Sequence, residues 1–160
     1  MSAPTRYICI DLGDKRTGLA ISDSITRLVS PLEVLEVPIA HEQGEVLLRA
    51  IVKAVRAQVS PRTPLEIVVG LPLVQEGKEG PRAKGVRAFA TRVQAALQCT
   101  MHFQDETLSS VEADWSMARS GMTRGEKKAK RDALAAAVIL RDFLAATSPR
   151  VGDGDEYPET

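Results

Sequence analysis

Hydrophobic and polar positions near the start of the chain follow the short period of β-strands. Three β-like segments, at about residues 6–11, 17–22 and 28–36, follow one another closely, which predicts an antiparallel meander. Pro31 interrupts the third segment, and proline cannot donate a hydrogen bond to a sheet. The third segment is therefore expected to be an edge strand or a strand that starts late.

The rest of the chain alternates between helical and strand patterns. Apolar residues recur at helical spacing from about residue 42 to 59, and Leu65–Leu71 reads as a buried strand. The later expected elements are a helix from Pro81 to about Leu97, a strand at Thr100–Gln104, a helix from Ser109 to about Arg119, and a helix that follows a loop at Ser120–Gly125 and ends near Ala145. This order predicts an α/β domain with a mixed five-stranded sheet and helices on both faces.

Composition limits the class of protein. A chain of 160 residues, 44% hydrophobic and 26% charged, fits one globular domain, expected at residues 1–146, with a disordered acidic tail at 147–160. The formal net charge is zero, so nucleic-acid binding would need a local basic patch. Cys9 and Cys99 lie in apolar stretches without disulfide or metal spacing. With no signal peptide and no apolar run near the ~20 residues of a membrane span, we expect a cytoplasmic protein without a membrane partner.

The segment Tyr7–Asp23 carries the first candidate for chemistry. Asp11 ends an apolar strand, and a glycine-containing turn leads into the next strand, with Gly13 and Gly18 keeping side-chain bulk low. A carboxylate in that place is costly to bury unless it is paired or holds a metal ion. The alternative is a surface hairpin in which Asp11 merely opens the turn.

Other carboxylates lie at element boundaries. Asp105 and Glu106 end the last strand, and because strand residues alternate between faces, only one of them should face Asp11. Both also suit the position ahead of a helix, where its dipole favours acids. Asp132 heads an apolar helical stripe and would point at the sheet if the helix includes it. Capping-box spacing at Thr123 leaves the helix start open, so Asp132 as an N-cap is the alternative.

Three converging carboxylates without a histidine or cysteine cluster suit a hard cation, Mg²⁺ or Mn²⁺. Two such ions, ~3.5–4 Å apart, would activate a water and stabilise the leaving oxygen of a phosphodiester. The expected catalytic and metal-binding residues are Asp11, Glu106 and Asp132, with Asp105 as a further metal ligand. His41 and His102 are isolated, and we expect a surface or core position for each.

Basic residues gather just before Asp132. The candidates for nucleic-acid binding are Lys15, Arg16, Arg124, Lys127, Lys128, Lys130 and Arg131, with Lys78, Arg82, Lys84, Arg87 and Arg119 as further members. A solvated loop is the alternative. Aromatic residues make up only 4% of the chain, which argues against a stacking platform and favours recognition of the backbone.

Four blocks together resemble the YqgF/RuvX family, a branch of the RNase H-like fold. They are DLGDKRTG at 11–18, IVVGLPL at 67–73, DETLSSVEA at 105–113 and KAKRDALAAAVIL at 128–140. The resemblance implies an RNase H-like sheet with the first strand central, and a metal-dependent nuclease. It also implies acidic site positions at Asp11, Glu106 (with Asp105 beside it) and Asp132. Members are described as enzymes of 5′-end maturation of pre-16S ribosomal RNA, and earlier as Holliday-junction resolvases.

Two positions depart from the family pattern. Thr107 stands where the family usually has arginine, and Glu76 where it has aspartate.

The expected function is a nuclease that acts on pre-16S rRNA, with ribosomal precursor particles among its partners. The alternative substrate is branched DNA, and the protein is expected to be a monomer or a homodimer. Half of an actin-like or sugar-kinase ATPase is a second hypothesis, although such enzymes need two lobes. A non-catalytic RNA-binding ribosome-assembly factor is the third.

Overall fold

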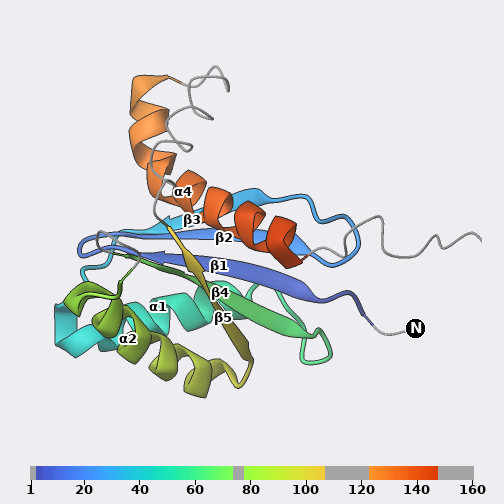
Figure 1. Cartoon of the computed structure of the whole chain (residues 1–160), viewed down its shortest axis with the longest axis horizontal. Coiled ribbons are helices and arrows are strands. Elements are labelled where there is room, and N and C mark those ends of the chain that lie inside the picture. The colour runs from blue at the N-terminus through green and yellow to red at the C-terminus, as the bar shows by residue number, and fades with distance from the viewer. Residues whose placement is uncertain (1–2, 74–77, 107–122, 148–160) are drawn as a thin grey trace, which may run out of the picture.

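A five-stranded mixed sheet organises the molecule (Figure 1). The structure is a computed structural model and describes residues 3–73, 78–106 and 123–147. The strands are β1 (Arg6–Leu12), β2 (Thr17–Asp23), β3 (Ser30–Leu35), β4 (Leu65–Leu71) and β5 (Thr100–Asp105). Their order across the sheet is β3-β2-β1-β4-β5, with antiparallel pairing from β1 to β3 and parallel pairing among β1, β4 and β5. The predicted meander, the central first strand and the edge position of β3 are confirmed.

Helices cover both faces of this sheet (Figure 1). A short 3₁₀ turn, η1 (His41–Gly44), precedes α1 (Glu45–Arg56), which lies with α2 (Pro81–Leu97) on one face, while α4 (Arg124–Thr147) crosses the other. Pro81 occupies the first turn of α2, as predicted. None of the described helices has the length and hydropathy needed to cross a bilayer. The helix predicted from Ser109 and the predicted tail lie outside the described residues.

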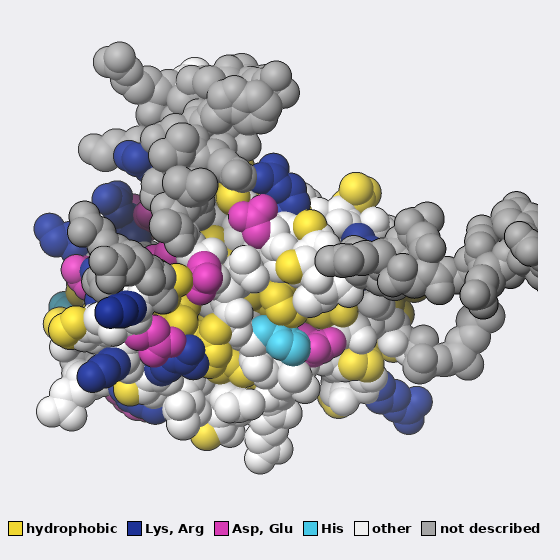
Figure 2. Space-filling model, in the orientation of Figure 1, with side chains coloured by type: hydrophobic (Ala, Val, Ile, Leu, Met, Phe, Trp, Pro, Cys, Tyr) yellow, Lys and Arg dark blue, Asp and Glu magenta, His cyan; other side chains and the backbone are white. Residues whose placement is uncertain are grey.

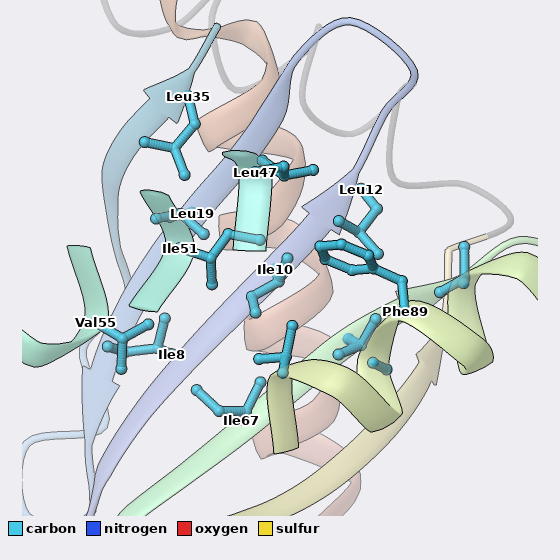
Figure 3. Close-up of a cluster of buried hydrophobic side chains, with 14 of the residues drawn as sticks. Ile8, Ile10, Leu12, Leu19, Leu35, Leu47, Ile51, Val55, Ile67 and Phe89 are labelled. Carbon is cyan, nitrogen blue, oxygen red and sulfur yellow. The ribbon is translucent and has the colours of Figure 1, made fainter. Parts of the chain in front are cut away.

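Alternation along the central strands separates two cores. Ile8, Ile10 and Leu12 point toward α1 and α2, where Figure 3 shows them beside Leu47, Ile51, Val55 and Phe89. Cys9 lies on the opposite face and packs with Ala20 against α4. Because β1 alternates with period two, Asp11 shares the α4 face with Cys9. The first strand therefore carries its carboxylate toward α4.

Glycine lets α4 pack closely on β2. A Cβ atom at Gly18 would collide with the carbonyl group of Asp132 and lie 2.9 Å from the backbone nitrogen of Ala133. These neighbours are backbone atoms, which cannot rotate away as a side chain can. This close packing fixes the position of Asp132 relative to β2.

A capping box starts α4 earlier than Asp132. The Glu126 amide donates to Thr123 Oγ1 at 3.3 Å, and the Thr123 amide donates to Glu126 Oε2 at 2.9 Å. The helix accordingly begins at Arg124, so the predicted loop as far as Gly125 is too long. Asp132 lies inside the helix, and the alternative that it serves as an N-cap is wrong.

Candidate active site

Three carboxylates from separate elements line one pocket of about 200 Å³. Asp11 lies near the end of β1, Glu106 directly follows β5, and Asp132 comes from α4. Since β1, β4 and β5 are parallel, their carboxyl ends lie at the same edge of the sheet, which brings the first two together. The remaining lining residues are Leu12, Gly13, Arg16 and Arg82. The three positions predicted to converge are therefore neighbours.

Asp11 is in an unfavourable environment for a charge. Burial raises the pKa of Asp11 well above its usual value of 3.8, and the charge of Glu106 and a hydrogen bond between the two side chains raise it further. Asp132 adds to this effect, while the guanidinium of Arg82 opposes it. Two carboxylates that share a hydrogen bond hold a proton between them unless a cation replaces it.

Gly70 makes room for Glu106. A Cβ atom at Gly70 in β4 would lie 2.7 Å from Glu106 Oε2 and 2.8 Å from Ile139 Cδ1. The sequence alone assigned Gly70 no role, and its one signal was a glycine inside a predicted buried strand. The glycine leaves space for the Glu106 carboxylate between β4 and α4.

Asp105 does not join this group. It is exposed, and as the residue before Glu106 it points away from the α4 face. Of the two adjacent acids, Glu106 lines the pocket and Asp105, the last residue of β5, does not.

Asp132 contacts a basic residue of the β1–β2 hairpin. Arg16 Nε lies 3.6 Å from Asp132 Oδ2, and both side chains are partly exposed. Below Asp132, Ala136 and Ile139 are fully buried against the sheet, as the apolar stripe predicts. The helix therefore directs its polar end into the pocket and its apolar stripe into the core.

The predicted basic residues divide into two groups. Arg16 lines the pocket, and Lys15, Lys130 and Arg131 are exposed close to pocket residues along the chain, whereas the side chains of Arg124, Lys127 and Lys128 lie outside the described part of the molecule. Figure 2 shows Lys and Arg side chains gathered at the end of the molecule where the β1–β2 hairpin and the start of α2 lie. This end also carries the carboxylate pocket.

The two histidines lie elsewhere. His41 is exposed in η1, and His102 Nε2 lies 2.7 Å from Glu66 Oε1 with its ring centroid 4.8 Å from that of Phe143. Neither lines the pocket.

The donors of the pocket fit a hard divalent cation. All three are carboxylates, the ligands that Mg²⁺ and Mn²⁺ prefer, and a cation would offset the repulsion that raises the pKa of Asp11. Among residues 3–73, 78–106 and 123–147, no group of three or more histidine, cysteine, aspartate or glutamate side chains is arranged so that it could hold a metal ion as it stands. Asp11 and Glu106 share a hydrogen bond, and Asp132 forms an ion pair with Arg16. A cation bound by all three carboxylates would replace both interactions.

The raised pKa of Asp11 predicts how the stability of the metal-free protein depends on pH. The folded protein holds this proton more tightly than the unfolded chain, so the contribution to the free energy of unfolding is complete below pH 3.8 and is lost as pH rises through the raised pKa. Each pKa unit corresponds to about 1.4 kcal/mol. Urea unfolding in EDTA between about pH 4 and 8 should show wild type losing stability relative to Asp11→Asn as pH rises. Parallel curves would contradict the shift.

Comparison with known proteins places the fold first. The structure of "T. thermophilus RuvC in complex with Holliday junction substrate" matches with a TM-score of 0.52 and 16% identity, covering 89% of this chain and 95% of that one. The sheet order and this likeness define an RNase H-like fold.

The chain belongs to the RuvX family, whose model, described as "RuvX: Holliday junction resolvase", matches residues 5–146. A protein of Chloroflexus aurantiacus is 36% identical over 153 residues, covering 96% of this chain and 95% of its own. One of Anaeromyxobacter sp. (strain K) is 38% identical over 144 residues, covering 90% and 99%. Both bear the name "Putative pre-16S rRNA nuclease".

Proposed function

We propose that this protein is a metal-dependent nuclease, a hydrolase acting on ester bonds, that processes the 5′ end of pre-16S rRNA. The observation that carries the proposal is the meeting of Asp11, Glu106 and Asp132 in one pocket bordered by Arg16 and Arg82. The names of the curated relatives support the choice of ribosomal RNA.

The three carboxylates would hold Mg²⁺ or Mn²⁺, two ions in the full arrangement. Bound there, the metal supplies an activated water and charge stabilisation for the leaving oxygen. Asp11 and Glu106 present their oxygens from the sheet edge, and Asp132 presents its own from the facing helix. Packing of α4 on Gly18 holds the two sides at a set separation.

Basic side chains around the pocket would bind the phosphate backbone. Arg16 and Arg82 lie in the pocket wall, and Lys15, Lys130 and Arg131 are exposed close to pocket residues along the chain. Contacts of this kind position a nucleic acid without reading its bases. The substrate would then be chosen by its shape.

Cleavage of a four-way DNA junction is the second candidate function. The description of the family model favours it, and the RuvC structure that shares the fold is a complex with such a junction. A junction has two-fold symmetry, so this activity would require a symmetric homodimer. For rRNA processing a monomer suffices, and we place the protein in the cytoplasm, with ribosomal precursor particles as its partners.

One experiment separates these functions. Labelled RNA carrying the 5′ leader of 16S rRNA and a labelled four-way DNA junction are incubated with the protein in Mg²⁺ and in Mn²⁺, with EDTA controls. Metal-dependent cleavage of the RNA is the expected result. Cleavage of the junction alone would indicate a resolvase. Binding without any cleavage would indicate the non-catalytic assembly factor.

A further inference from the structure

Arg16 is built into the site by the geometry of the hairpin. A Cβ atom at Gly13 would collide with the carbonyl oxygen of Arg16, so glycine permits the tight turn that delivers this side chain. Gly18 in β2 lies on the face on which α4 packs, and Arg16, in the loop just before β2, reaches the same helix through its ion pair. The backbone contact at Gly18 and the ion pair of Arg16 meet the same residue, Asp132.

The second arginine of the pocket is held differently. Arg82 Nη1 lies 3.5 Å from Asp14 Oδ2, a carboxylate that is outside the pocket. Arg16 instead occupies a carboxylate that the proposed metal site needs. The two residues border the same pocket, and Arg82 acts on Asp11 through its charge, but only Arg16 forms an ion pair with one of the three carboxylates.

We propose that Arg16 is a counter-ion of Asp132 that couples metal binding to nucleic-acid binding. This inference rests on the proposed metal site. A divalent cation and the guanidinium compete for the carboxylate of Asp132, so Arg16 weakens metal binding while the nucleic acid is absent. A phosphate of the nucleic acid offers the guanidinium a better-matched partner, to which arginine binds with two parallel hydrogen bonds. When the phosphate draws Arg16 away, Asp132 is released for the metal.

The geometry allows this exchange. The Arg16 and Asp132 side chains are 45% and 37% exposed, and their 3.6 Å separation is a loose contact rather than a tight bidentate pair. Ion pairs of this kind are weak, so the competition should change metal affinity by about two- to fivefold. By linkage, metal must raise nucleic-acid affinity by the same factor by which nucleic acid raises metal affinity.

Calorimetric titration of Ca²⁺ into the full chain tests the coupling. Wild type, Arg16→Gln and Arg49→Gln are titrated with and without the leader RNA, and gels confirm that the RNA stays intact. Without RNA, Arg16→Gln should bind Ca²⁺ about two- to fivefold more tightly than wild type. The tightening caused by RNA should be smaller by the same factor in Arg16→Gln, and should be retained in Arg49→Gln, which removes one positive charge at an exposed position that pairs with Glu42 and does not line the pocket.

The outcomes separate this inference from the proposed function. Ca²⁺ binding with equal RNA-dependent tightening in wild type and Arg16→Gln would overturn the coupling and leave the metal site standing. No Ca²⁺ binding by wild type, with or without RNA, would overturn both. Arg16→Lys, which keeps the charge but lacks the planar fork, should show intermediate coupling and guards against a folding defect in the glutamine variant.

Discussion

Asp11→Asn is expected to abolish cleavage while making the metal-free protein more stable. The substitution removes a proposed metal ligand. Mutation of residues that only support metal ligands already lowers metal affinity or activity about 10–100-fold, so we expect the cleavage rate to fall about 10²-fold or more. It also removes a buried charge that Glu106 and Asp132 repel, and the asparagine amide can still donate to Glu106. The variant should therefore be more stable than wild type at neutral pH, as measured by urea unfolding in EDTA.

Added metal should reverse that order of stability. Wild type gains stability in proportion to the logarithm of metal concentration above its dissociation constant, and Asp11→Asn should gain little. Asp105→Asn is the matched control, because Asp105 is exposed and does not line the pocket. An Asp11→Asn protein that is less stable than wild type without metal would show that Asp11 has a structural role instead.

Gly18→Ala should be among the most damaging single changes that add only one methyl group. The new Cβ would collide with the backbone of Asp132, so α4 must move away from β2. Overpacking of this kind costs about 1–3 kcal/mol. Moving Asp132 by about 1 Å can reduce a reaction rate about 10²-fold. Urea unfolding and RNA cleavage rates measure the two effects.

Gly85→Ala is the control for Gly18→Ala. Gly85 lies in α2, and a Cβ atom there would meet nothing within 4 Å. Alanine in a helix interior is favoured over glycine by roughly 0.5–1 kcal/mol, so this variant should be slightly more stable than wild type. Wild-type stability in Gly18→Ala would mean that α4 does not pack closely on β2.

Much of this architecture could be predicted because apolar periodicity reports burial directly. Leu65–Leu71 and Pro81–Leu97 have the predicted bounds, since prolines and a glycine mark their ends. The apolar stripe behind Asp132 also predicted its direction correctly, and the capping interaction of Thr123 decided between helix interior and cap.

Other features depend on contacts between distant segments. The alternation of side chains along a strand predicts that only one of Asp105 and Glu106 faces Asp11. Which of the two does so depends on the strand register, in which Asp105 pairs with Leu71. Gly18 and Gly70 acquire their roles only from the atoms of α4 and Glu106 packed against them. Thr107 and Glu76, the departures from the family pattern, lie outside the described residues.

The most direct test of the proposed site compares two adjacent acids. Cleavage of the 16S leader RNA is measured against Mg²⁺ concentration for wild type, Glu106→Gln and Asp105→Asn. We predict a loss of about 10²-fold or more for Glu106→Gln, and a rate within a few-fold of wild type for Asp105→Asn. Equal rates for wild type and Glu106→Gln, or a loss confined to Asp105→Asn, would contradict a catalytic site built from Asp11, Glu106 and Asp132.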